Sequence, residues 1–117
     1  MKGIIVVVED NRMFRKILCD GFEDFGYLAV GYGDGLEAIE AIRGDLKYNM
    51  ALIDLELPHC NGIEVMEASK KVNPNVPVIL MSGYNDRPAT KADEFIFKGE
   101  LTSRDELRRL AKRYIKD

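Results

Sequence analysis

The chain has 117 residues, 46% of them apolar, which suits one domain with a single buried core and excludes a multidomain enzyme. Twenty acidic and 17 basic residues leave a net charge of −3 at pH 7, without the overall basic character that a long nucleic-acid interface needs. The sequence therefore predicts a single domain over 1–117 that makes no direct contact with nucleic acid.

The sequence does not indicate membrane insertion, a zinc site or a disulfide framework either. No run approaches the roughly 18 consecutive apolar residues of a membrane-spanning helix. Acidic residues follow the short apolar run at the N-terminus, where a signal peptide would continue with apolar ones. The two cysteines, Cys19 and Cys60, and the one histidine do not form the pattern of a disulfide framework or a zinc site. We expect a cytoplasmic protein.

Five short apolar segments predict β-strands. Three of them are continuous runs, too short for helices and typical of strands that are buried on both faces of a parallel sheet. The other two are shorter or more mixed, which suits the edges of a sheet. In chain order the five predicted strands are 4–8, 28–32, 50–53, 76–81 and 94–97.

Helical periodicity separates most of these strands. Apolar residues recur at helical spacing over 14–25, 36–42, 63–72 and 104–115. Ser103 followed by Glu106 predicts a capping box at the start of the last of these helices. Such strand–helix alternation is typical of an α/β fold whose right-handed crossovers place helices on both faces of the sheet.

The predicted architecture is a single doubly wound, five-stranded parallel sheet in the order 2-1-3-4-5. One connection is unusual, because only fifteen residues separate Ser82 from Lys98 and the fifth strand occupies the last of them. The fourth helix of the fold must therefore be shortened or absent. Since Pro88 fits only the first turn of a helix, any helix here would begin near Arg87 and run to about Ala92.

Acidic residues follow the first and third strands, which are neighbours in this order. Glu9 and Asp10 end the first strand and Asp54 ends the third. Each alone is readily explained as a helix cap or a loop residue. Together, three carboxylates at one edge of the sheet favour a hard divalent cation with oxygen ligands, and Mg²⁺ is the natural candidate.

A hydroxyl and an ammonium group follow the remaining strands. Ser82 ends the fourth strand and Lys98 ends the fifth. A turn hydroxyl and a surface lysine are common, but beside an acidic nucleophile and a metal they are the parts needed to accept a phosphoryl group. In this interpretation Asp54 attacks phosphorus, Lys98 offsets the negative charge and Ser82 donates a hydrogen bond.

These residues together resemble the ordered signature of a known family. The segments 8–11 (VEDN), 51–54 (ALID) and 33–39 (GDGLEAI), with Ser82 and Lys98, look like those of bacterial two-component response regulator receiver domains, chemotaxis regulators among them. The resemblance covers essentially the whole chain and implies a flavodoxin-like fold. It also implies phosphorelay signal transduction.

The resemblance implies a role for each residue of the site. Asp54 would accept a phosphoryl group from a sensor histidine kinase or a phosphotransfer protein. Asp10, Asp54, Glu9 and the backbone carbonyl of Glu56 would hold Mg²⁺. The domain would catalyse only its own aspartyl phosphorylation and dephosphorylation, so it would not be a turnover enzyme.

The resemblance also implies a switch and an output surface. Ser82 and Phe95 would move together to report the phosphoryl group, and the fourth helix, the fifth strand and the last helix would form the surface that partners bind. Because the fourth helix must be shortened or absent here, we expect an output surface built mainly from the fifth strand and the last helix, which would bind a downstream protein or a second copy of the chain. Two departures stand out. Gly99 replaces a proline that usually follows Lys98 through a cis bond, so we expect a trans bond here, and Glu9 replaces the usual aspartate.

Two alternatives remain open on these residues. In the first, the chain is a pseudo-receiver that acts as a phosphorylation-independent interaction module. In the second, Asp54 and Glu56 are the nucleophile and general acid of a small Mg²⁺-dependent phosphohydrolase, although 117 residues leave no room for a cap domain that excludes water.

Overall fold

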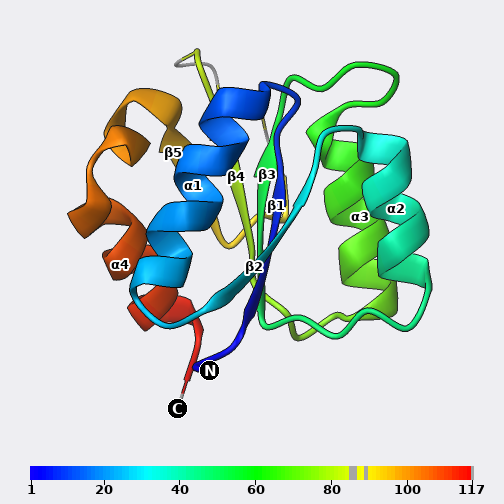
Figure 1. Ribbon diagram of the computed structural model, residues 1–117. Coiled ribbons are helices and arrows are strands. Elements are labelled where there is room, and N and C mark those ends of the chain that lie inside the picture. Colours follow the sequence, from blue (N-terminus) through cyan, green and yellow to red (C-terminus); the bar gives the residue numbers. More distant parts are fainter. Residues whose placement is uncertain (85–86, 89, 117) are drawn as a thin grey trace.

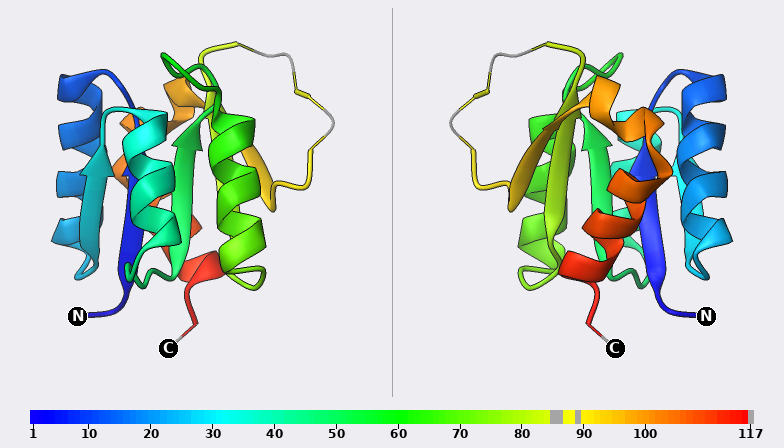
Figure 2. Two further views of the ribbon diagram at one scale, coloured as in Figure 1. Left: turned by 90° about the vertical axis from the view of Figure 1, so that its right-hand side faces the viewer. Right: turned by 90° about the vertical axis from the view of Figure 1, so that its left-hand side faces the viewer.

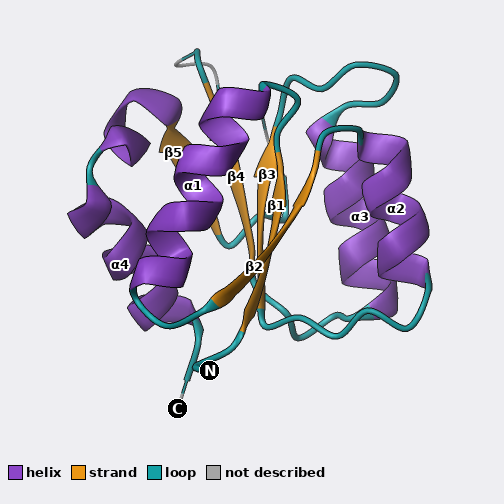
Figure 3. Cartoon of the chain, viewed as in Figure 1, coloured by secondary structure: helices purple, strands orange, loops and turns teal. Residues whose placement is uncertain are grey.

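The fold is a single parallel sheet between two layers of helices, as a computed structural model of residues 1–84, 87–88 and 90–116 describes it (Figures 1 and 3). All neighbouring strands are parallel, and their order is β2-β1-β3-β4-β5, as predicted. The strands are β1 (Ile4–Val8), β2 (Leu28–Tyr32), β3 (Met50–Asp54), β4 (Val78–Ser82) and β5 (Glu94–Phe97).

Helices cover both faces of this sheet (Figures 1 and 2). On one face lie α1 (Arg12–Asp24) and α4 (Arg104–Tyr114), and on the other lie α2 (Gly35–Arg43) and α3 (Gly62–Val72). A 3₁₀ helix, η1 (Lys98–Thr102), joins β5 to α4. Within the part of the chain that the structure describes, no helix has the length and apolar character to cross a membrane.

The three central strands, β1, β3 and β4, are apolar on both faces and are buried on both faces, whereas the edge strands β2 and β5 are partly exposed. Alternate residues of β1 point to opposite sides, so that Ile5 and Val7 pack under α1 and α4 while Val6 and Val8 pack under α2 and α3. All five residues of β3 and of β4 are buried. These two strands extend to Asp54 and Ser82, so the polar residues predicted to follow the strands are their last residues.

The helices begin close to the predicted positions, but their capping hydrogen bonds are not always the predicted ones. Asn61 accepts a hydrogen bond from the backbone N–H of Glu64, whose side chain accepts one from the Asn61 N–H, so α3 begins with a capping box. The capping box predicted at Ser103 is wrong: α4 begins there, but the Ser103 side chain makes no capping hydrogen bond. The backbone of η1 runs directly into this helix, and the Ser103 carbonyl accepts from the Glu106 N–H.

The connection between β4 and β5 has the form predicted from its length. The residues described there, 83–84, 87–88 and 90–93, form no helix, so the fourth helix of the fold is absent from them. Residue 89, which falls inside the range predicted for a short helix, lies outside the described residues. Across the described chain there is no cis peptide bond, and the Lys98–Gly99 bond is trans as expected.

Candidate functional site

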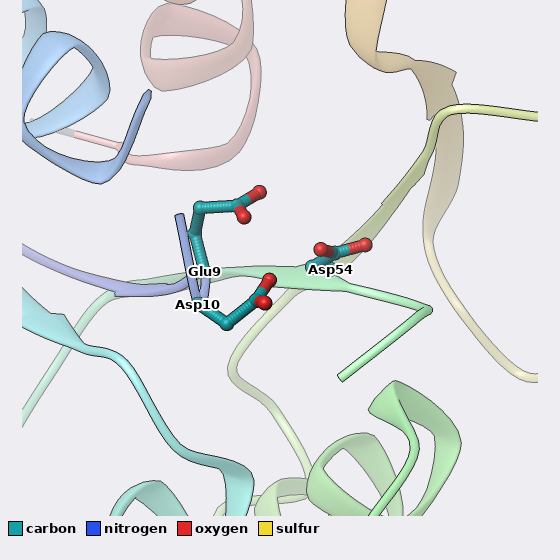
Figure 4. A group of neighbouring side chains, drawn as sticks. All are labelled: Glu9, Asp10 and Asp54. Atoms are coloured by element: carbon teal, nitrogen blue, oxygen red, sulfur yellow. The ribbon is translucent and has the colours of Figure 1, made fainter. Parts of the chain in front are cut away.

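The carboxyl ends of β1 and β3 bring three acidic side chains together. Val8 pairs with Ile53 in the sheet, so the residues that follow them, Glu9 and Asp54, are neighbours. Carboxylate oxygens of Glu9, Asp10 and Asp54 all lie within 4.8 Å of one another. Figure 4 shows the Asp10 and Asp54 side chains extending into the same space, with Glu9 above them. The predicted convergence at this edge of the sheet is therefore present.

The turn after β1 fixes the two acidic residues differently. Glu9 is fully buried, and its Oε2 accepts a hydrogen bond of 2.9 Å from the Asn11 N–H. The Arg15 guanidinium donates to the Glu9 carbonyl oxygen at 2.7 Å. A Cβ at Gly33 would lie 2.8 Å from that guanidinium, so glycine leaves the space for it. Asp10 is exposed and free to reach a ligand from solvent.

Lys98 joins the two buried carboxylates. Its Nζ lies 2.6 Å from Asp54 Oδ2 and 2.7 Å from Glu9 Oε1. The ammonium also lies 5.6 Å from the centre of the Phe14 ring. Since η1 begins at Lys98, the turn after β5 directs this side chain back over the ends of β3 and β1. A single cation thus offsets the charge of two carboxylates.

The ionisation of Asp54 reflects this setting. Burial raises the pKa of the Asp54 carboxyl to about 6, and the nearby Glu9 charge adds to the increase. The Lys98 hydrogen bond and the Glu56 N–H, which donates to Asp54 Oδ1 at 3.0 Å, act in the opposite direction. Burial alone would lower the pKa of Lys98, but its bonds to Asp54 and Glu9 raise it.

The donor set fits a hard divalent cation. The three side chains offer only carboxylate oxygens, the ligands that Mg²⁺ prefers. Glu9 Oε1 is buried and makes no aligned hydrogen bond among the described residues, although Lys98 Nζ is close enough to form an ion pair. A buried oxygen left in this way has an unused lone pair for a metal ion. The site therefore fits the predicted Mg²⁺.

Ser82 is tied to a residue that lies beyond β3. The buried hydroxyl donates a hydrogen bond of 2.8 Å to Glu56 Oε2 and accepts one of 3.0 Å from the Tyr84 N–H. Glu56 Oε1 accepts a longer bond, 3.4 Å, from the Gly83 N–H. The Glu56 side chain therefore joins the end of β4 to the loop after β3.

Phe95 lies on β5 and faces the α3 side of the sheet. It is half-buried against the cluster that includes Leu80 of β4, and the Arg87 guanidinium lies 5.5 Å from the centre of its ring. Ser82 pairs in the sheet with Phe97, two residues further along β5. The two residues predicted to form a switch thus lie on adjacent strands, and they form no hydrogen bond with each other.

Two features of the site were not predicted. The Arg15 bond to the Glu9 carbonyl joins α1 to the acidic turn, and the glycines at 31 and 33, opposite Arg15, were a signal for it in the sequence. For Glu56 the sequence pointed to the backbone carbonyl as a metal ligand and to the side chain as the general acid of the hydrolase alternative, but not to a bond with Ser82. Its bond to Ser82 depends on a side-chain rotamer, which no spacing in the sequence specifies.

Comparisons with known proteins agree on one family. The family model of the response regulator receiver domain matches residues 5–109. The sporulation initiation phosphotransferase F of Bacillus subtilis is 26% identical over 98% of this chain and 95% of its own length. The nodulation protein W of Bradyrhizobium diazoefficiens is 28% identical over 76% of this chain but only 39% of its own length.

A solved structure agrees in fold and carries a ligand pair. The response regulator protein TrrA of Thermotoga maritima, in complex with Mg²⁺ and beryllium fluoride, is 27% identical and superposes with a TM-score of 0.82. The match covers 95% of this chain and 97% of that one.

Proposed function

Because the chain belongs to the family of response regulator receiver domains, whose place is in two-component signalling, we propose that 1–117 is one domain controlled by phosphorylation of Asp54. The observation that carries the proposal is that Lys98 forms ion pairs with both Asp54 and Glu9, two carboxylates buried at adjacent strand ends. Such a pairing prepares a carboxylate and a cation for the same incoming anion.

The reaction is the transfer of a phosphoryl group from a phosphohistidine of a sensor histidine kinase or a phosphotransfer protein. An Asp54 carboxylate oxygen bonds to phosphorus as the phosphorus–nitrogen bond breaks, and the electron pair of that bond stays on the imidazole. Asp54 Oδ1 is held by the Glu56 N–H, and Oδ2 by Lys98. These bonds orient the carboxylate for in-line attack.

Mg²⁺ belongs to the proposal as a cofactor. The side chains of Glu9, Asp10 and Asp54, with the backbone carbonyl of Glu56, would hold it. When bound, the ion neutralises charge on the phosphoryl oxygens. Once the Asp54 oxygen carries the phosphoryl group, Lys98 neutralises further charge from the β5 side, because its Nζ lies 2.6 Å from Asp54 Oδ2.

The output is a change in what the β5 and α4 surface binds. Ser82 turns its hydroxyl to a phosphoryl oxygen and Phe95 follows it. The exposed arginines Arg108 and Arg113 on α4 suit an acidic downstream partner or a second copy of the chain. The domain changes its own phosphorylation state and has no separate substrate, so it acts as a switch and not as a turnover enzyme.

Backbone amide NMR with Mg²⁺ and beryllofluoride tests this proposal without knowledge of the kinase. We expect saturable, Mg²⁺-dependent shifts at Asp54, Ser82, Phe95 and Lys98, and none in Asp54→Asn. A folded protein that binds neither ligand would overturn the proposal in favour of a phosphorylation-independent interaction module.

A further inference from the structure

The hydroxyl of Ser82 is already engaged before any phosphoryl group is present. A serine hydroxyl has one proton to donate and two lone pairs to accept with. Here the proton goes to Glu56 Oε2 at 2.8 Å, and a lone pair accepts the Tyr84 N–H at 3.0 Å. The same proton cannot serve a phosphoryl oxygen on Asp54 until the Glu56 bond is broken.

Glu56 is placed to sense the charge on Asp54. Its own N–H donates to Asp54 Oδ1 at 3.0 Å, while its side chain holds Ser82. One residue thus contacts both sides of the site. A phosphoryl group on Asp54 adds negative charge two residues away, and this charge repels the Glu56 carboxylate and attracts the Ser82 proton.

The two partners differ in their freedom to move. Glu56 is exposed, so its carboxylate can turn into water at little desolvation cost, whereas Ser82 is fully buried at the end of β4. When the bond breaks, Glu56 is therefore the group that leaves. Ser82 stays at the end of β4, the strand that pairs with the end of β3 where Asp54 lies, with a free proton.

We propose that the Glu56 side chain is a latch that holds the Ser82 hydroxyl away from the phosphoryl pocket and is released when Asp54 is phosphorylated. Glu56 is a positioning residue that acts through Ser82. The latch rests on the proposed function and adds a regulator to it, because phosphorylation must first break a hydrogen bond to a carboxylate. The resting state is stabilised by this bond, and the affinity of the site for a phosphoryl group is lowered by it.

Titration with beryllofluoride at saturating Mg²⁺ measures the latch. Glu56→Ala leaves the backbone carbonyl in place and removes the acceptor, so it should bind the mimic about tenfold more tightly than wild type, as expected for a hydrogen bond to a charged group. Glu56→Gln loses the charge but keeps an acceptor, and its affinity should lie between the two. Glu40→Ala, which removes an exposed carboxylate from α2, is the matched control and should bind as wild type does.

A double-mutant cycle separates the latch from simple charge repulsion. If Glu56 acts through Ser82, the gain from Glu56→Ala should be at least about fivefold smaller in a Ser82→Ala background. Without any ligand, Glu56→Ala should also shift the amide resonances of Gly83 and Tyr84. The Gly83 N–H donates to Glu56 Oε1, and the Tyr84 N–H donates to the Ser82 hydroxyl that Glu56 holds.

The outcomes of the cycle are distinct. Equal gains in the two backgrounds, or no gain in Glu56→Ala while wild type binds the mimic, would overturn the latch and leave the proposed function intact. No saturable binding in any variant would overturn the proposed function and the latch together.

Discussion

The two sides of the candidate site are held in opposite ways. On the β1 and β3 side, Lys98 binds Glu9 and Asp54, all groups that the proposed reaction uses. On the β4 side, Ser82 is bound by Glu56, a group that the reaction must displace. The first side is organised before the phosphoryl group arrives, and the second has to rearrange. The change of state should therefore begin at the β4 side.

The largest expected loss of stability comes from a substitution at Gly62, where the loop that carries Glu56 meets α3. A Cβ at Gly62 would lie 2.3 Å from the Asp54 carbonyl oxygen and 2.8 Å from the Leu55 Cα, both backbone atoms that cannot turn aside. We expect Gly62→Ala to lower the free energy of unfolding by about 3 kcal/mol. The loop between β3 and α3 should also shift and carry Glu56 away from Ser82. The β4 side of the site would then no longer be held by the Glu56 bond.

Urea denaturation checks this expectation, and Gly83→Ala is the matched control. No atom lies within 4 Å of a Cβ built at Gly83, so this substitution should change stability by less than about 0.5 kcal/mol. Equal effects of the two substitutions would mean that the close packing at Gly62 is not what fixes the loop.

Removing the charge of Asp54 should change the free energy of unfolding by less, and should raise it. The pKa of Asp54 is raised by burial to about 6 in the folded protein, from an ordinary value of 3.8. The folded state then holds a proton between these values that the unfolded state has lost, so the contribution of Asp54 to stability falls as the pH rises from about 4 to about 6. Without metal at pH 7.5, Asp54→Asn should be more stable than wild type by about 2 kcal/mol.

Thermal unfolding in a chelator, over a range of pH, measures this difference. The excess stability of Asp54→Asn should shrink as the pH falls from about 6 to about 4 and disappear below that, where the wild-type carboxyl becomes protonated in both states. Mg²⁺ should raise the melting temperature of wild type more than that of the variant. A variant that is less stable than wild type at pH 7.5 would contradict the conclusion that burying the Asp54 charge beside Glu9 destabilises the fold.

The smallest expected effect lies outside the site, where β5 meets α4. The Arg109 guanidinium binds Glu94 at 2.6 Å and Glu106 at 2.5 Å on a partly exposed surface. Burial alone would raise the pKa of Glu94, but hydrogen bonds from Arg109 and Tyr114 lower it overall. Arg109→Met should cost about 1 kcal/mol of unfolding free energy at neutral pH.

Arg113→Met is the control for this surface network. Arg113 lies 3.9 Å from Glu94, so its loss should change the urea midpoint much less. Because the Glu94 carboxylate is charged in these pairs, the difference between the two variants should shrink as the pH falls below about 4. A persistent difference at low pH would assign it to packing and not to charge.

The sequence was sufficient for the sheet and for which residues meet at its edge. Strand segments apolar on both faces identified a covered parallel sheet, and the order of the strands then places Glu9 beside Asp54 without any knowledge of side chains. The length of the connection alone predicted that the fourth helix would be shortened or absent, and its described residues form none. These are properties of the backbone path, which hydrophobic pattern and connection length determine.

The hydrogen bonds were less predictable, because each depends on rotamers and on competing donors. Ser103 has the sequence of a helix cap, yet η1 arrives with its own backbone bonds and the hydroxyl makes no cap. Similarly, the spacing of Asp54, Glu56 and Ser82 places them at one edge but does not say that Glu56 turns to Ser82.

The short connection between β4 and β5 also has a consequence for how the chain folds. Fifteen positions separate Ile79 from its partner Glu94, against 45 between Ile5 and Met50 in the pairing of β1 with β3. A loop one third as long costs roughly 1 kcal/mol less conformational entropy to close. The described residues of this connection form no helix, so the strand that delivers Lys98 to the site pairs with β4 at a low entropic cost.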